Sequence, residues 1–111
     1  MSKGSNSFKE IVFNFMEASG FDKEVTETLV IEFREYSLTL VVSIKDYIAN
    51  NNFKDASILL HRLKGSAGNI RATEISSQAL RAEEALKILD IELVENLLMD
   101  IKISLKSLTE E

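Results

Sequence analysis

The feature that most constrains the fold is the absence of proline from all 111 residues, combined with only four glycines. Such a chain lacks the residue that interrupts helices most strongly. Apolar residues recur along it at spacings of three and four, and not at every second position as in strands. The sequence therefore predicts an all-α protein.

The apolar pattern and the breaks between its segments predict five helices. They cover about residues 7–18, 22–49, 53–69, 73–89 and 90–108. Gly20 is placed to end the first helix, and Asp22 and Thr73 are suited to cap the second and the fourth. Short connections force successive helices to reverse direction, so we expect an antiparallel up-down-up-down four-helix bundle with an additional short N-terminal helix.

The inner faces of these helices are expected to carry the apolar stripes. The stripe of the long helix is Val25, Leu29, Phe33, Tyr36, Leu40, Ile44 and Tyr47; that of the fourth helix is Ile75, Ala79, Ala82, Leu86 and Leu89. We interpret these residues, together with Phe8 and Phe15, as core or helix-packing residues and not as a cofactor site.

Composition favours one ordinary globular domain over residues 1–111, with 45% hydrophobic and 28% charged residues. Residues 1–6 and 109–111 are expected to be disordered or foreign to the natural chain. The chain has no cysteine, no apolar run long enough to span a membrane and no secretory leader, so we expect a cytoplasmic location. The net charge of −5 argues against nucleic-acid binding.

His61 is the only histidine and lies in residues 61–70, His-Arg-Leu-Lys-Gly-Ser-Ala-Gly-Asn-Ile. With about 100° per residue, the imidazole points about 140° away from the apolar side of its helix. We therefore expect His61 to face solvent.

Two glycines follow His61 on its own side of the helix. Gly65 and Gly68 each cost about 1 kcal/mol relative to alanine inside a helix, so a reason for them is required. Our hypothesis is that they leave room for a protein that brings a reacting group to the imidazole. For Gly68, an alternative is that it ends the helix as a C-cap.

Positive charge gathers around His61 in this acidic protein. Lys54, Arg62, Lys64 and Arg71 face only one acidic residue of the same segment, Asp55. A solvated helix face would explain such a cluster, but its position around a nucleophile favours a functional interpretation. Lys64, three residues after His61, could reach an anionic group held on the imidazole.

The sequence contains a nucleophile, the imidazole of His61, but none of the motifs that we would expect of an enzyme's active site. A neutral imidazole is nucleophilic near pH 7 without a separate base. We find no Ser/His/Asp arrangement, no second histidine and no phosphate-binding glycine loop, and a single histidine without cysteine gives poor support for a metal site. We expect this chain to need no cofactor of its own.

Residues 61–70 resemble the signature of histidine-containing phosphotransfer domains, His-x-Leu-Lys-Gly-(Ser/Ala)-(Ala/Ser)-x-x-(Leu/Ile/Val)-Gly-Ala. Chain length and helix order also resemble this family, and Ala82-Glu83 is similar to a recurrent Leu-Glu or Ile-Gln pair on the fourth helix. The chain departs from the family where Arg71-Ala72 replaces Gly-Ala. The departure could alter the helix terminus and the choice of partner.

The resemblance implies a phosphoryl carrier and not an enzyme. His61 would accept a phosphoryl group from a receiver-domain aspartate or a sensor kinase and pass it to a response-regulator aspartate. Lys64 would stabilise that group, Gly65 would keep the approach clear, and Mg²⁺ would belong to the partner receiver domain. The expected partner-binding residues are Lys54, Ser57, Ile58, Arg62, Gly68 and Arg71.

The expected partners are receiver domains of response regulators and of hybrid sensor kinases, without membrane insertion, and a self-contained bundle favours a monomer. Two other classes stay open. A dimerisation and histidine-phosphotransfer module of a sensor kinase is disfavoured by Arg62 and the lack of proline. A helical adaptor in which His61 is incidental is the other alternative.

Overall fold

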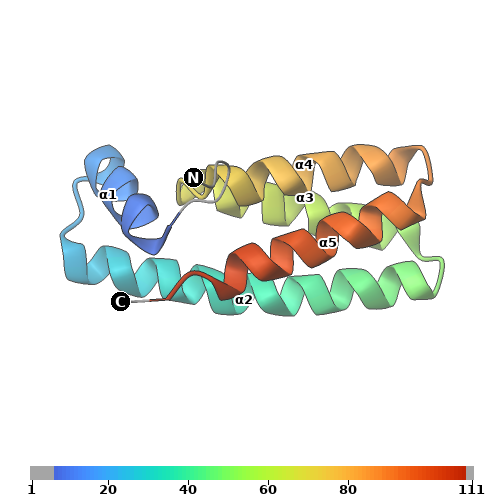
Figure 1. The fold of residues 1–111 in the computed structure, drawn as a ribbon, viewed down its shortest axis with the longest axis horizontal. Coiled ribbons are helices and arrows are strands. Elements are labelled where there is room, and N and C mark those ends of the chain that lie inside the picture. The colour runs from blue at the N-terminus through green and yellow to red at the C-terminus, as the bar shows by residue number, and fades with distance from the viewer. Residues whose placement is uncertain (1–6, 110–111) are drawn as a thin grey trace.

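The computed structural model describes residues 7–109, and this part of the chain is all helical. The five helices are α1 Phe8–Ser19, α2 Lys23–Ala49, α3 Phe53–Asn69, α4 Thr73–Lys87 and α5 Ile91–Lys106. Helix α2 packs against α3 and α5, and α4 packs against the same two helices, so the four longer helices enclose one core. Figure 1 shows them extended along the long axis, with α1 beside the first part of α2 at one end. The prediction of five helices is confirmed.

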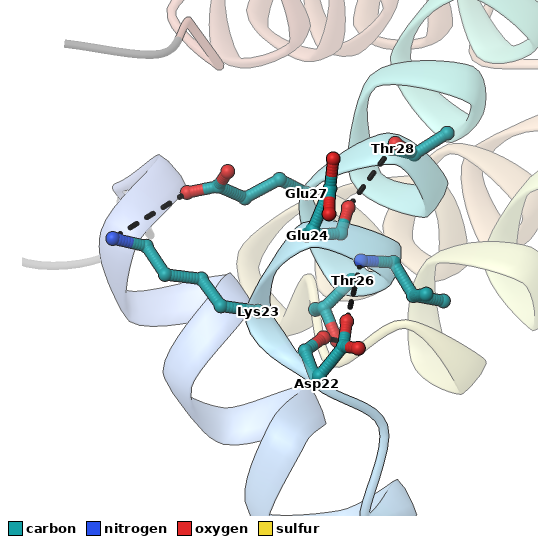
Figure 2. Close-up of polar contacts among 7 residues, drawn as sticks. Asp22, Lys23, Glu24, Thr26, Glu27 and Thr28 are labelled. Atoms are coloured by element: carbon teal, nitrogen blue, oxygen red, sulfur yellow. Dashed lines mark hydrogen bonds and ion pairs between the residues drawn. The ribbon is translucent and has the colours of Figure 1, made fainter.

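The end of α1 and the start of α2 lie at the predicted caps. Figure 2 shows the start of α2, where an Asp22 side-chain oxygen accepts a hydrogen bond from the Val25 backbone N–H at 2.9 Å. The Thr26 hydroxyl donates to the Asp22 carbonyl at 2.8 Å. At the end of α1, Gly20 has φ +80° and donates to the Met16 carbonyl, as a left-handed glycine cap does. The predictions for Asp22 and Gly20 are confirmed.

The stripe predicted for α2 was wrong at two positions. Val25 and Tyr36 are 46% and 45% exposed, whereas the neighbouring Thr26 and Ser37 are fully buried. The inner face of α2 therefore runs through small hydroxyl residues that the apolar pattern does not mark. Thr26 satisfies its hydroxyl within its own helix, which lowers the cost of burying it.

The fourth helix differs from its prediction at both ends. Ala72 occupies the N-cap position, and Thr73 is the first helical residue and not the cap. The helix ends at Lys87, so Leu89 lies in the turn, 60% exposed, and not in the core. The predicted disorder at residues 1–6 and 109–111 lies outside the described residues except at Thr109, which is described and whose N–H donates to the Ser107 carbonyl at 3.0 Å.

Three helices end in the same turn without glycine. After α3, the Ala72 N–H donates to the Ala67 carbonyl at 2.8 Å and the Arg71 N–H donates to the Gly68 carbonyl at 3.2 Å. This is the Schellman pattern, whose left-handed residue is usually glycine. Here the left-handed residue is Arg71, with φ +69°; Leu89 and Asn51, both with φ +58°, occupy the equivalent place after α4 and α2. The terminus at Arg71 thus keeps the geometry for which glycine is favoured.

Replacing Arg71 by glycine should stabilise the fold by about 1 kcal/mol, because a left-handed conformation strains a residue that has a Cβ. Thermal unfolding followed by circular dichroism should show a rise in Tm of about 4 °C. Leu89→Gly is the matched variant with the same backbone geometry away from His61, and it should behave alike. An unchanged or lower Tm in both variants would contradict this account of the turns.

Candidate functional site

His61 lies on α3 with most of its side chain in solvent. Its side chain is 70% exposed, while Leu60 and Leu63 on the same helix are fully buried in the core. The apolar period of α3 therefore places the imidazole outside the bundle. The exposure predicted for His61 is confirmed.

A carboxylate from the neighbouring helix holds one nitrogen of this ring. An Oε2 atom of Glu83, on α4, lies 3.2 Å from His61 Nδ1. A carboxylate can only accept, so a hydrogen bond here requires the proton on Nδ1. In that tautomer the lone pair of the ring is on Nε2. The nitrogen with the free lone pair is then the one that Glu83 does not contact.

Glu83 also joins His61 to Lys64. Its second oxygen, Oε1, lies 3.2 Å from Lys64 Nζ, and the Glu83 side chain is only 12% exposed. The Lys64 side chain is 29% exposed, so the ammonium group is partly withdrawn from solvent. One largely buried carboxylate thus orients the imidazole and pairs with the cation next to it.

The glycine at position 65 meets no structural requirement in the described part of the chain. A Cβ built on Gly65 would have no neighbouring heavy atom within 4 Å, and its backbone has no left-handed φ. Neither packing nor backbone geometry therefore explains a residue that costs about 1 kcal/mol in a helix. The surface one turn from His61 is bare.

Gly68 lies inside α3, which continues to Asn69, so the C-cap alternative for Gly68 was wrong. It is half-buried and faces α4, where a Cβ would lie 3.6 Å from Ser76 Oγ. The same hydroxyl donates to the Lys64 carbonyl at 3.1 Å. Ser76 therefore attaches α4 to α3 beside the site.

The other predicted partner-binding residues also lie on α3 or in the turn after it. Lys54, Ile58, Arg62 and Arg71 are exposed, and Ser57 is half-buried. Among the described residues, no carboxylate forms an ion pair with Lys54, Arg62 or Arg71. These three cations are available to a partner, whereas the charge of Lys64 is offset by Glu83.

Sequence reasoning did not identify Glu83 and Ser76 as site residues. Glu83 is 22 positions from His61, and only the packing of α4 on α3 brings the two together. The one signal that pointed to Glu83 was the resemblance of Ala82-Glu83 to the family pair on the fourth helix. Ser76 gave no signal.

The described residues contain no group of three or more His, Cys, Asp or Glu side chains that could hold a metal ion. Within residues 7–109, no helix has both the length and the apolar character needed to cross a membrane.

Comparison with models of protein families assigns the chain to a family. The family model of the Hpt domain matches residues 28–111, so the chain belongs to the Hpt domain family. Domains of this family are phosphocarrier modules that take part in histidine phosphotransfer in phosphorelays. The match begins inside α2 and leaves α1 outside it. Searches of curated proteins and of solved structures gave no significant match.

Proposed function

We propose that this chain accepts a phosphoryl group on His61 from an aspartyl phosphate of a receiver domain, or from a sensor kinase, and delivers it to the aspartate of a response regulator. One observation carries the proposal: the imidazole is 70% exposed while its Nδ1 contacts the largely buried carboxylate of Glu83. This arrangement presents Nε2, with its lone pair, to an incoming protein.

The transfer forms one bond and breaks one bond. The Nε2 lone pair attacks the phosphorus atom of the aspartyl phosphate, and the bond from phosphorus to the aspartate oxygen breaks, so that the aspartate leaves as a carboxylate. The proton on Nδ1 stays in place. The ring then carries positive charge, which Glu83 can stabilise from 3.2 Å because opposite charges attract strongly at partly buried sites. Delivery to the second aspartate is the reverse step.

In this proposal the α3 residues next to His61 have two roles: they leave room for the receiver domain to approach, and they offset the negative charge of the phosphoryl group. Gly65 leaves the space in which the receiver brings its phosphoryl group to Nε2, and Lys64 can turn its ammonium from Glu83 toward that group. The chain needs no cofactor of its own, and Mg²⁺ belongs to the receiver domain. Phosphoryl transfer requires mainly positioning and charge stabilisation, which two proteins can share.

The docking surface that we propose consists of the residues of α3 and its following turn that surround His61. They are Lys54, Ser57, Ile58, Arg62, Gly68 and Arg71. The unpaired cations suit the acidic pocket of a receiver domain, and Ile58, 48% exposed, adds an apolar contact.

We further propose that the helices form an up-down-up-down antiparallel bundle and that the protein is cytoplasmic. The short connections between the helices support the antiparallel arrangement.

The test of the proposed function is phosphoryl transfer between purified proteins. The chain is incubated with a receiver domain carrying ³²P on its aspartate and, separately, with ³²P-phosphoramidate, and acid-labile, alkali-stable label is measured. We expect label on the chain, followed by its loss when a second, unlabelled receiver is added. If several receivers and phosphoramidate all leave the chain unlabelled, His61 is incidental and the adaptor alternative is correct.

Removing the carboxylate beside His61 should slow transfer without preventing it. Glu83→Ala loses a hydrogen bond worth about 1 kcal/mol, which corresponds to about a fivefold lower rate of phosphorylation. Lys64→Ala is the paired variant, because it keeps the carboxylate and removes the cation. It should shorten the lifetime of the phosphorylated protein by a similar factor. Rapid-quench kinetics measure both quantities, and wild-type values for both variants would refute these roles.

A further inference from the structure

Helix α5 carries an exposed stripe whose charges are ordered along its length. The stripe is Glu92, Glu95, Met99, Lys102 and Lys106, with spacings of three, four, three and four residues that place all five side chains on one face. All five are exposed to solvent. The order is therefore acidic, acidic, apolar, basic, basic.

Three exposed apolar side chains lie around the centre of this stripe. Met99 and Ile103 on α5 are 61% and 62% exposed, and Val42 on α2 is 61% exposed. A groove between the two helices is lined by Lys45 and Val41 of α2, among other residues, and by Met99 of α5. Figure 1 shows α5 running beside α2. An apolar centre thus lies between an acidic end and a basic end.

The helix dipole explains the signs of the charges and not the whole pattern. Acidic residues are favoured near the start of a helix and basic residues near its end. However, the dipole gives no reason for leaving Met99 and Ile103 in water. It also does not offset the repulsion between Glu92 and Glu95, which are neighbours on the helix surface. A partner with the opposite order of charges would account for both.

A second copy of the same chain, related by a two-fold axis, presents the charges of its stripe in the opposite order. When two α5 helices lie antiparallel and cross at Met99, position 92 of one copy faces position 106 of the other, and position 95 lies within one residue, about 1.5 Å, of facing position 102. Each acidic residue then meets a lysine of the other copy, while the apolar residues meet at the centre. An isologous contact needs this kind of self-complementary surface.

We propose that the chain forms an antiparallel homodimer through the α5 stripe and the adjoining face of α2. The ring of packing contacts places α5 diagonally opposite α3, the helix that carries His61. Both acceptor histidines therefore stay accessible in the dimer. The self-contained bundle led us to expect a monomer, and this inference replaces that expectation without depending on the proposed phosphotransfer.

Sedimentation equilibrium of the full chain measures the association. The average mass should rise from 12.5 kDa toward twice that value between about 10 µM and 1 mM, the range of a weak and small interface. Reversing one charge, in Lys102→Glu or Glu95→Lys, should raise the dimer Kd at least about tenfold because like charges then face each other. The variant with both reversals restores opposite charges and should return within about threefold of wild type.

The same change of charge elsewhere is the control. Arg81→Glu lies on an exposed position of α4 and should leave the Kd unchanged, and circular dichroism should show that every variant keeps its helix content. The proposal is overturned by a wild-type mass of 12.5 kDa at every concentration. It is equally overturned by a dimer that survives the single reversals, or by a double reversal no tighter than the single ones.

Discussion

A His61→Gln variant is expected to take up no acid-labile phosphate from a labelled receiver domain, a loss of at least about 100-fold relative to wild type. Glutamine retains a polar side chain of similar length but has no nucleophilic nitrogen, so the N–P bond cannot form. The fold should be nearly unaffected. The imidazole is 70% exposed, and its contact with Glu83 contributes no more than about 1 kcal/mol at such a position.

Two measurements separate loss of the acceptor from loss of structure. Thermal unfolding should place the Tm of the variant within about 4 °C of wild type. Lys87→Gln changes an exposed cation at the end of α4, outside the proposed docking surface, and serves as the control, because it should still be labelled to completion. Label retained by His61→Gln would identify another acceptor, and a large fall in Tm would mean that the imidazole supports the fold.

The second large effect is expected at Gly65. Gly65→Gln should slow transfer from a receiver by about 10- to 100-fold, because the side chain fills the space one turn from the imidazole and displaces the incoming phosphoryl group. The same variant should unfold at a higher temperature, since glutamine favours a helix over glycine by up to about 1 kcal/mol. No heavy atom lies within 4 Å of the added Cβ, so the substitution has no steric cost in the folded chain.

A series of side-chain sizes makes this prediction sharper. Gly65→Ala should share the gain in stability and lose much less activity, so that the rate falls with volume while the Tm does not. Phosphoramidate, which is far smaller than a receiver, should label Gly65→Gln nearly as fast as wild type. If the receiver also transfers to Gly65→Gln at the wild-type rate, clearance is not the role of this glycine.

Periodicity was sufficient to predict the helices because each of them must bury one side. The bounds of α3 follow from the apolar residues and from the asparagine turn before it. Periodicity was less informative where small polar residues are buried. Thr26 and Ser37 lie on the inner face of α2 at positions where the stripe favours Val25 and Tyr36.

Helix ends were harder to predict because their turns do not contain the usual glycine. Leu89 continues the apolar spacing of α4, so the sequence extends the helix through it, whereas the chain turns at Ile88. The backbone hydrogen bonds from Leu89 and Asp90 to Leu86 and Ala85 stabilise that turn. The apolar pattern of the sequence does not show that these hydrogen bonds outweigh the strain of the left-handed backbone conformation at Leu89.

Some residues of the candidate site could be predicted from the sequence, and Glu83 could not. His61, Lys64 and Gly65 lie on one helix, and their mutual placement follows from 100° per residue. Glu83 comes from α4, and its pairing with both His61 and Lys64 depends on how two helices pack. The sequence therefore predicts which residue is the nucleophile, and the packing of α4 on α3 indicates which ring nitrogen Glu83 leaves free.

The most direct test is to locate the phosphoryl group on the ring. The chain, labelled with ¹⁵N in its single histidine, is phosphorylated by a receiver domain and examined by ¹⁵N and ³¹P NMR. We expect the phosphoryl group on Nε2 of His61, with the proton retained on Nδ1 beside Glu83. A phosphoryl group on Nδ1, or on any residue other than His61, would contradict this expectation.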